Sequence, residues 1–271
     1  MKNTVDILDA SKIGSLCPGL PRPEVYDTAD STNNTAKRRA EEGCPQFLCI
    51  AADSQTNGRG RLGRSFASPR GSGLYMSVVL RPSVPSEHIT LITPASAVIL
   101  CRAAEELFGI SPSIKWVNDL YLGGRKICGI LTEAAFSPDG HAEYAVVGAG
   151  INMYRPEGGF PPEIADKAGY MLEAAQSDAR SRMCAAFIRG LSDVCAGLSD
   201  ADKRKSIADE YRRRCFVIGK RVTFIKNGKS VSATAVDTDD CCRLIVKHDS
   251  GELEALSTGE VSVRIENTGS I

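Results

Sequence analysis

The sequence predicts an α+β fold in which a mixed β-sheet is packed with helices and is followed by a small β-barrel. Residues 22–217 combine long helical patterns with short apolar runs of strand length. From residue 218 to 271 the pattern changes to short alternating segments separated by turn residues, which is typical of a small barrel. Residues 1–21 contain prolines and glycines with little periodicity, so we expect an extended N-terminal extension.

The composition excludes several classes of protein. The chain has 271 residues, of which 42% are hydrophobic, so a sizeable core can form. Lys+Arg and Asp+Glu are both 33, and this neutral balance argues against bulk affinity for nucleic acid. The 10 cysteines include no Cys-x-x-Cys, and no signal run or apolar stretch of membrane-spanning length occurs. We therefore expect a cytoplasmic protein without membrane contact, whose cysteines are mostly small core residues.

The first elements are expected in the order strand, helix, strand, strand, helix. A short strand at 24–27 precedes a helix over 34–42, and Ser31, Thr32 and Asn33 are typical N-cap residues for that helix. The apolar runs that predict the next two strands flank a polar loop. A long apolar pattern then predicts a helix closed by a glycine. These later segments are 47–51, 74–80, and 89–108 before Gly109.

A lysine and a glycine are unexpected in the strands that follow. Residues 114–122 and 125–131 are β-prone and are separated by a Gly-Gly pair, which predicts a hairpin. Strict alternation places Lys126 and Gly129 on opposite faces of the second strand. A lysine inside an apolar strand is costly unless it meets an anion, and a glycine weakens a strand unless something passes close to it. Solubility of an edge strand is the alternative explanation for Lys126.

The rest of the chain completes both parts of the predicted fold. A strand at 144–152 ends in glycines and an asparagine. An amphipathic helix is predicted over 178–198, and a shorter, charged helix over 203–214. The strands of the barrel are predicted, in order, at 221–225, 230–236, 243–247, 252–255 and 261–265.

The loop between the first two apolar runs is rich in glycine and arginine. Its sequence is Gln55-Thr-Asn-Gly58-Arg59-Gly60-Arg61-Leu-Gly63-Arg64. Glycine exposes backbone N–H groups, and arginine offers charged forks that match carboxylate and phosphate, so the loop predicts a site for a small anion. A dinucleotide fingerprint is excluded because proline and glycine at 69–73 prevent the helix that it requires, and no P-loop motif occurs. A solvated arginine loop or a nucleic-acid patch is the alternative.

Five blocks of residues extend this pattern along the chain. They are Asp30-Ser31-Thr32-Asn33, Gln55-x-x-Gly58-Arg59-Gly60-Arg61-x-Gly63-Arg64, Lys115-Trp116-x-Asn118-Asp119, Arg125-Lys126-x-x-Gly129-Ile130-Leu131 and Gly148-x-Gly150-Ile-Asn152. From about residue 22 to the C-terminus, the chain resembles the biotin–protein ligases, with the blocks in that family's order and spacing. A single block is weakly specific, whereas the ordered set is highly specific. Val117 replaces the family's usual proline and Phe66 a common tryptophan, which implies altered packing rather than lost chemistry.

The resemblance implies a class II synthetase-like biotin–lipoate ligase catalytic domain and a small SH3-like C-terminal β-barrel. It also implies a two-step reaction. The carboxylate of biotin attacks the α-phosphate of ATP, which gives biotinyl-5′-AMP and pyrophosphate. A lysine of a biotin carboxyl carrier domain then attacks this anhydride and releases AMP.

The same resemblance assigns residues to this reaction. The implied catalytic residues are Lys126, Arg61 and Asp119, because two meeting anions need a cation and the attacking lysine needs a base. The implied biotin contacts are Ser31, Thr32, Asn33, Gln55, Gly58, Arg59, Gly60, Arg61, Lys126, Gly129, Gly148 and Gly150. The implied ATP and adenylate contacts are Arg61, Arg64, Phe66, Trp116, Asn118, Lys126 and Asn152.

Cofactors and partners follow from the family as well. ATP and biotin are the implied substrates, and Mg²⁺ is expected with ATP, held mainly by its phosphates. The implied protein partner is the carrier domain of a biotin-dependent carboxylase, and a homodimer through sheet edges is compatible with the family. Residues 1–21 leave no space for the repressor domain of longer members, so we expect a ligase-only form without specific DNA binding. The alternatives are a lipoate–protein ligase of the same fold and a non-catalytic biotin-binding regulator.

Overall fold

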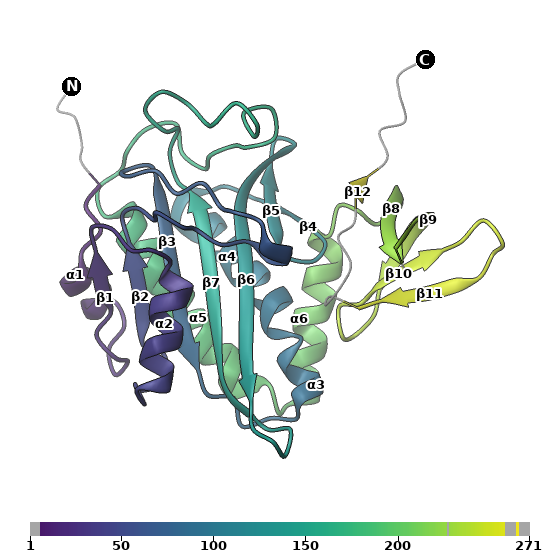
Figure 1. Ribbon diagram of the computed structural model, residues 1–271, viewed down its shortest axis with the longest axis horizontal. Coiled ribbons are helices and arrows are strands. Elements are labelled where there is room, and N and C mark those ends of the chain that lie inside the picture. The colour runs from purple at the N-terminus through teal and green to yellow at the C-terminus, as the bar shows by residue number, and fades with distance from the viewer. Residues whose placement is uncertain (1–5, 227, 258–263, 266–271) are drawn as a thin grey trace.

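The main body of the protein is a mixed β-sheet with helices on both faces (Figure 1). The computed structural model describes residues 6–226, 228–257 and 264–265. Within these residues, seven strands pair in the order β1-β2-β3-β7-β6-β5-β4, and only β1 and β2 pair in parallel. The predicted α+β fold class is confirmed. The strands are β1 (Glu24–Tyr26), β2 (Cys49–Ala52), β3 (Gly73–Leu80), β4 (Ser113–Lys115), β5 (Asp119–Leu122), β6 (Arg125–Phe136) and β7 (Ala142–Asn152).

The helices cover the two faces of this sheet unequally. On one face α2 (Thr32–Glu41) packs Ala36 and Ala40 onto a small apolar cluster that includes Ile50 and Val146. The opposite face is buried under the larger core, to which the other helices contribute. These elements are α1 (Ala10–Ser15), α3 (Ser86–Ile89), α4 (Ile92–Phe108), α5 (Ala179–Gly197) and α6 (Ala201–Arg214), and a 3₁₀ turn, η1 (Arg61–Gly63), lies in the glycine- and arginine-rich loop.

The alternation of side chains along β7 creates a hollow beside α2. Tyr144 and Val146 are buried against α2, whereas Val147 belongs to the core on the other face. The next two positions on the α2 face are Gly148 and Gly150. Because glycine has no side chain, these two positions leave open space above the backbone of β7, just beyond the end of α2.

The N-terminal residues differ from the predicted extended segment, because 10–15 form α1. The Asp9 side chain caps this helix by accepting hydrogen bonds from the backbone N–H groups of Ser11 (2.7 Å) and Lys12 (3.0 Å). Ile13 is fully buried in the main core. A helix of 6 residues with one buried side chain gives no detectable period, which is why the sequence pattern missed it.

The helix predicted over 89–108 is divided into α3 and α4. Pro94 explains the break, because a proline ring clashes with the carbonyl four residues earlier and lacks the N–H that a helix interior requires. A helix that contains Pro94 therefore cannot continue back through Thr90. At the other end, Gly109 closes α4 with a φ of 67°, as predicted.

The residues at 114–122, predicted as one β-prone segment, form two strands. β4 and β5 pair in antiparallel register through Ile114 and Leu120. The turn between them carries the Trp116–Val117 peptide bond, which is cis. This turn brings Asn118 and the first residue of β5 to the edge of the hollow.

A β-bulge in β6 overturns the predicted faces of that strand. Leu120 pairs with Cys128 whereas Tyr121 pairs with Lys126, so β6 contains one extra residue at this point. Lys126 consequently turns to the same side as Gly129, and its Nζ lies 3.2 Å from the position that a Cβ of Gly129 would take. The prediction that these two residues face opposite ways is wrong, because a count of alternating positions does not include a bulge.

The residues after 217 form a second, antiparallel sheet, which is consistent with the predicted small SH3-like domain. Among the described residues its strand order is β11-β10-β9-β8-β12. Asn227-Gly228 and Thr258-Gly259 are turn-type pairs in the sequence between predicted strands. Residue 227, the pair at 258–259 and the first part of the predicted strand 261–265 lie outside the described residues. The strands are β8 (Arg221–Lys226), β9 (Lys229–Thr238), β10 (Leu244–Lys247), β11 (Leu253–Leu256) and β12 (Arg264–Ile265).

The two sheets are joined by a shared core and by hydrogen bonds. Phe224 of β8 belongs to the same buried cluster as the helices of the main body. The indole Nε1 of Trp116 donates to the Cys242 carbonyl at 2.9 Å, and the Tyr211 hydroxyl donates to the Val117 carbonyl at 3.0 Å. The turn between β4 and β5 is thus held in place by α6 and by the C-terminal sheet.

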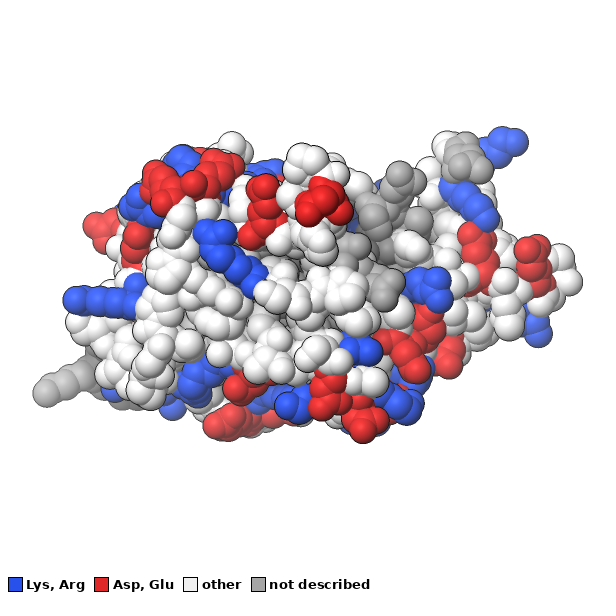
Figure 2. Space-filling view, turned by 90° about the horizontal axis from the view of Figure 1, so that it is seen from below, with Lys and Arg blue, Asp and Glu red and all other residues white. Residues whose placement is uncertain are grey.

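The distribution of side chains agrees with the sequence in two further respects. Seven of the cysteines are buried, as expected for small core residues. Acidic and basic side chains are intermixed around an uncharged centre on the face seen in Figure 2. In the described parts of the chain, no helix combines the length and the apolar character that crossing a bilayer requires.

Candidate functional site

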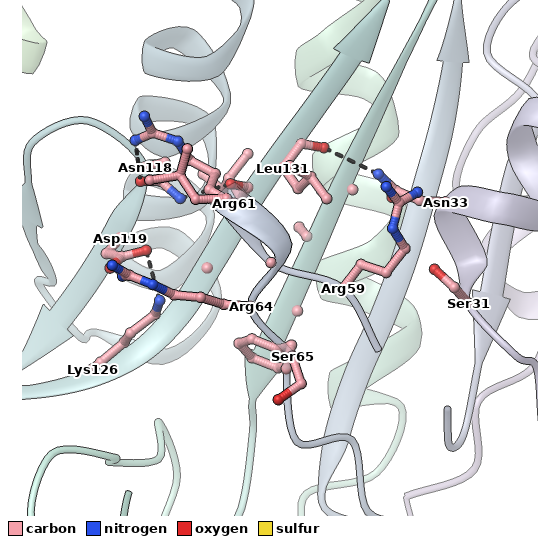
Figure 3. Close-up of a pocket in the computed structure, with 18 of the residues that line it drawn as sticks. Ser31, Asn33, Arg59, Arg61, Arg64, Ser65, Asn118, Asp119, Lys126 and Leu131 are labelled. Atoms are coloured by element: carbon pink, nitrogen blue, oxygen red, sulfur yellow. Dashed lines mark hydrogen bonds and ion pairs between the residues drawn. The ribbon is translucent and has the colours of Figure 1, made fainter. Parts of the chain in front are cut away.

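The hollow beside α2 is a cavity of about 630 Å³ (Figure 3). Its floor is formed by β6 and β7, and its walls by the N-terminus of α2, by β5 and by residues 55–66, here called the arginine-rich loop. All of the site residues predicted from the sequence line it except Gly58 and Asn152. The lining residues that the prediction missed are Leu62, Ser65, Lys115, Ile130, Leu131, Ala149, Lys167 and Arg264.

One end of the cavity is lined mainly by polar, uncharged side chains. Ser31 occupies the N-cap position of α2, but its side chain makes no capping hydrogen bond. Gln55 takes that role, since its Oε1 accepts from the Thr32 backbone N–H at 2.8 Å while its Nε2 donates to the Ser68 hydroxyl at 2.8 Å. The predicted capping by the Ser-Thr-Asn side chains is therefore wrong, and these side chains line the cavity instead.

Asn33 is held by contacts from β3 and β6, the two strands that flank β7. Its Oδ1 accepts from the Ser77 hydroxyl at 2.6 Å, and its Nδ2 donates to the Glu133 carboxylate at 2.9 Å and to the Leu131 carbonyl at 3.4 Å (Figure 3). A Cβ at Gly148 would lie 1.9 Å from the Asn33 Oδ1, so this position requires glycine. The amide is thereby fixed in one orientation at the polar end.

The Phe66 ring lies on bare backbone in the middle of the cavity. Gly129 and Gly150 are cross-strand partners in β6 and β7. A Cβ at Gly150 would lie 2.6 Å from the Phe66 ring, and one at Gly129 would lie 3.4 Å from it. The paired glycines therefore form a flat surface that accepts an aromatic ring, and this explains why the strand interior tolerates glycine at both positions.

An ion pair marks the other end of the cavity. Lys126 Nζ lies 2.7 Å from Asp119 Oδ1, and their side chains are 32% and 22% exposed. The anion that Lys126 was predicted to meet is thus, in this structure, a carboxylate on the paired strand β5 (Figure 3). A half-buried pair that faces a cavity leaves its cation within reach of a second anion.

Two more cations at this end have perturbed pKa values. Burial lowers the pKa of the Arg61 guanidinium. The negative charge of Asp119 opposes this shift, and the positive charge of Arg64 adds to it. Burial also lowers the pKa of the Lys115 ammonium, and the nearby charge of Lys126 acts in the same direction. Cations that disfavour each other's charge stabilise an anion bound among them.

The position of Arg61 is fixed by the turn after β4. Its Nη1 donates to the Asn118 Oδ1 at 3.1 Å, and the Asn118 Nδ2 donates in turn to the Ile130 carbonyl at 2.8 Å. The arginine-rich loop therefore crosses from α2 to β5 and reaches over the floor of the cavity (Figure 3).

Arg59 makes different contacts from those of Arg61. Its guanidinium donates to both carboxylate oxygens of Glu133, at 2.9 and 3.1 Å, and to the Asn34 Oδ1 at 2.9 Å. Lys37 of α2 pairs with the same carboxylate. Burial raises the pKa of Glu133, but hydrogen bonds from Asn33 and Lys37 outweigh it, and the pKa lies below its ordinary value.

Gly58 and Asn152 support the site from outside the cavity lining. A Cβ at Gly58 would lie 2.3 Å from the Phe66 carbonyl oxygen, so glycine allows the arginine-rich loop to fold back on itself. The Asn152 Nδ2 donates to the Gly169 carbonyl at 2.9 Å. The segment that contains Gly169 also bonds to β6, where the Lys126 N–H donates to the Lys167 carbonyl at 2.8 Å.

Lys167 and Arg264 carried no usable signal in the sequence. Lys167 lies in an irregular segment, and Arg264 lies in the short strand β12 of the C-terminal sheet. Both reach the cavity only through contacts between segments that are distant in sequence. The C-terminal sheet therefore contributes a cation to the cavity, which short strand patterns alone could not indicate.

Comparison with known proteins agrees with this geometry. Residues 25–152 match the biotin/lipoate A/B protein ligase family, and residues 217–264 match the biotin protein ligase C-terminal domain. These matches identify residues 25–152 as a biotin/lipoate A/B protein ligase domain and residues 217–264 as a biotin protein ligase C-terminal domain. The first match contains every predicted site residue, and the second contains Arg264.

Curated relatives are similar to this chain over different lengths. The bifunctional ligase/repressor BirA of Bacillus subtilis is 37% identical over 150 residues, which are 55% of this chain and 46% of that protein. The chain thus spans about half the length of the curated Bacillus relatives that it matches. The biotin–[acetyl-CoA-carboxylase] ligase of Mycobacterium tuberculosis is 28% identical over 250 residues, 90% of this chain and 89% of that one.

Solved structures share the fold of this chain. A biotin protein ligase from Aquifex aeolicus, in complex with biotin and ATP, superposes with a TM-score of 0.72 and 24% identity, covering 90% of this chain and 99% of that chain. A biotin protein ligase from Leishmania major, in complex with biotinyl-5-AMP, gives a TM-score of 0.58 and 22% identity, covering 89% of this chain and 100% of that chain.

Proposed function

We propose that the chain is an ATP-dependent biotin–protein ligase, which activates biotin as biotinyl-5′-AMP and transfers it to a lysine of a biotin carboxyl carrier domain. The observation that carries this proposal is the division of one cavity into a neutral polar end and a cationic end over a floor of glycines. Biotin has a neutral ureido ring and an anionic carboxylate, and ATP is anionic, so such a cavity is complementary to both. The matches of residues 25–152 and 217–264 to ligase domains support the same conclusion.

The polar end is assigned to biotin. A ureido ring needs paired donors and acceptors, which Ser31, Thr32, Asn33 and Gln55 supply from one side. The backbone at Gly148 lets the ring approach the sheet, and Leu131 adds an apolar surface. The fixed orientation of Asn33 means that little side-chain entropy is lost on binding. Arg59 is assigned to the same end, although Glu133 rather than a ligand engages it here.

The cationic end is assigned to the meeting of the two anions. A biotin carboxylate and an α-phosphate about 4 Å apart repel by about 4 kcal/mol at an effective dielectric near 20. Lys126 lies where it can contact both, offset that repulsion and stabilise the charge that grows as the carboxylate oxygen attacks phosphorus and pyrophosphate leaves. Arg64 and Lys115 supply further positive charge for the phosphates. Phe66, Trp116 and Asn118 are assigned to the adenylate.

The transfer step is assigned to Asp119. A phosphate that binds Lys126 competes with the carboxylate of Asp119 for the same ammonium group. Asp119 is then available to accept a proton from the acceptor lysine, whose amine attacks the biotinyl carbonyl while AMP leaves. Arg61 reaches over the floor from the arginine-rich loop, and it keeps water from the anhydride as part of a lid.

Mg²⁺ is proposed to enter with ATP. Among the described residues, no group of three or more His, Cys, Asp or Glu side chains is arranged to hold a metal ion. Within that part of the chain, the single carboxylate in the cavity lining is Asp119, and it is paired with Lys126. These residues fit a metal held mainly by phosphate oxygens, where it would neutralise the leaving pyrophosphate. The acceptor is proposed to be the carrier domain of a biotin-dependent carboxylase in the cytoplasm.

One assay separates this function from its closest alternative. ATP–pyrophosphate exchange should depend on biotin and not on lipoate, because the polar end of the cavity matches the N–H and C=O groups of a ureido ring, and a dithiolane ring has neither. Exchange supported by lipoate alone would identify a lipoate–protein ligase. Tight biotin binding without exchange in either case would identify a non-catalytic regulator.

A further inference from the structure

We propose that Glu133 is a positioning residue that holds the arginine-rich loop and Asn33 in the arrangement needed for biotin activation. This rests on the proposed function. Glu133 does not belong to the cavity lining, and no sequence block contains it. Its carboxylate nevertheless connects three elements of the site, namely β6, α2 and the loop.

The contacts of Glu133 are divided between its two oxygens. Oε2 accepts from the Asn33 Nδ2 at 2.9 Å and from the Arg59 Nη1 at 3.1 Å, and Oε1 accepts from the Arg59 Nη2 at 2.9 Å. Lys37 pairs with Oε1 as well. A bidentate guanidinium–carboxylate pair fixes direction as well as distance, so Arg59 cannot turn without breaking two bonds.

The strand period places Glu133 correctly for this role. Gly129, Leu131 and Glu133 alternate along β6, so Glu133 lies on the same face of the strand as two residues that line the cavity. The side chain of Glu133 is 20% exposed and that of Arg59 is 37% exposed. The pair is therefore partly shielded from water. Because it links the loop to the surface of the sheet, its loss should increase the mobility of the loop and leave the hydrophobic core intact.

The carboxylate also controls what Asn33 presents to the cavity. The Asn33 Oδ1 is taken by the Ser77 hydroxyl, so its Nδ2 must point toward Glu133. A neutral glutamine at position 133 has one carbonyl oxygen, which accepts hydrogen bonds, and one NH₂ group, which donates them. The NH₂ group could not replace the second carboxylate oxygen as an acceptor for Asn33 or Arg59. One substitution thus disturbs both the loop and the polar end.

The direct test is trypsin cleavage of the loop in the full-length chain, followed by mass spectrometry. Cleavage after Arg61 and Arg64 measures how often the loop opens. We expect Glu133→Gln to increase this rate about fivefold, which corresponds to about 1 kcal/mol, the upper end for a partly exposed pair. An unchanged rate overturns the proposal.

Two matched variants show whether the effect is specific. Glu24→Gln removes a carboxylate that accepts a hydrogen bond from Arg39 of α2 at 3.0 Å. This carboxylate pairs with the same helix as Glu133 does, but it makes no contact with the loop. Lys37→Met removes the cation that Glu133 shares with α2 and leaves the Arg59 pair intact. Both should be cleaved at the wild-type rate. Equal acceleration in Glu24→Gln would overturn the proposal, because the effect would then be general destabilisation.

A double-mutant cycle tests whether Glu133 acts through Arg59. Arg59→Gln should accelerate cleavage after Arg61 and Arg64, and adding Glu133→Gln should increase it no further. Additive effects would overturn the coupling.

The second readout is kinetic and distinguishes positioning from a structural role. Glu133→Gln should raise the KM for biotin about fivefold while the KM for ATP stays within about twofold, because Asn33 lies at the biotin end. Faster cleavage with an unchanged biotin KM overturns the proposal. If wild type itself lacks biotin-dependent exchange, the proposed function fails, whereas the cleavage rates still decide whether Glu133 holds the loop.

Discussion

Replacement of Lys126 by methionine is the sharpest test of the proposed chemistry. Lys126→Met keeps a side chain of similar length but removes the ammonium group that lies 2.7 Å from Asp119. The full repulsion between the carboxylate and the α-phosphate is about 4 kcal/mol at about 4 Å. Because the lysine side chain is 32% exposed and shares its charge with Asp119, we take about 3–4 kcal/mol as the loss. The expected decrease in adenylation is about 10²–10³-fold.

The assay for this variant is biotin-dependent ATP–pyrophosphate exchange, with a thermal denaturation curve to verify folding. Arg125→Met is the matched control, because Arg125 precedes Lys126 on β6 and its side chain is directed to the Ala165 carbonyl, at 3.4 Å. The control should exchange at the wild-type rate. A folded Lys126→Met variant that exchanges within about threefold of wild type would refute the assignment of Lys126 to the transition state.

Three further outcomes are expected. Gly148→Ala should raise the KM for biotin about tenfold, because its Cβ would lie 1.9 Å from the Asn33 Oδ1; an unchanged KM would contradict the placement of Asn33. Arg61→Gly should let biotinyl-5′-AMP escape and label lysines of a bystander protein, and adenylate retention equal to wild type would count against a lid. Arg214→Met should lower the free energy of unfolding by about 1–2 kcal/mol at neutral pH, because Arg214 donates two hydrogen bonds to Glu105. Those bonds lower the pKa of Glu105, so their contribution is present above its unfolded-state pKa and is lost as the pH falls through the folded-state pKa. Urea denaturation at neutral and acid pH measures this, and a difference that persists in acid would be inconsistent with it.

The sequence was most informative where local pattern and chemistry coincide. Gly129 was identified because glycine weakens a strand interior, and the structure places it beside Lys126 and beneath the Phe66 ring. Residue types predicted an anion site in the glycine–arginine loop, with a solvated loop as the alternative, and the loop does border the cavity. Local patterns of this kind are retained when the chain folds, because they depend on near neighbours.

What the sequence could not show depends on register and on distant contacts. The bulge in β6 reversed the direction of Lys126, and a single extra residue leaves no trace in a count of alternating positions. Ser31 was read as a cap, but Gln55, more than 20 positions later, supplies the acceptor. Glu133 escaped notice because its partners lie on α2 and in the loop, and only tertiary structure brings those together.

The position of Trp116 allows intrinsic fluorescence to report on both the cavity and the C-terminal sheet. Trp116 is the single tryptophan of the chain, is 4% exposed and lines the cavity. Its indole N–H donates to the Cys242 carbonyl beyond α6. Because indole emission responds both to the polarity around the ring and to the bond at its nitrogen, filling of the cavity and separation of the C-terminal sheet should each change the spectrum. A ligand titration and a denaturation curve could therefore be followed at one excitation wavelength in the unmodified chain.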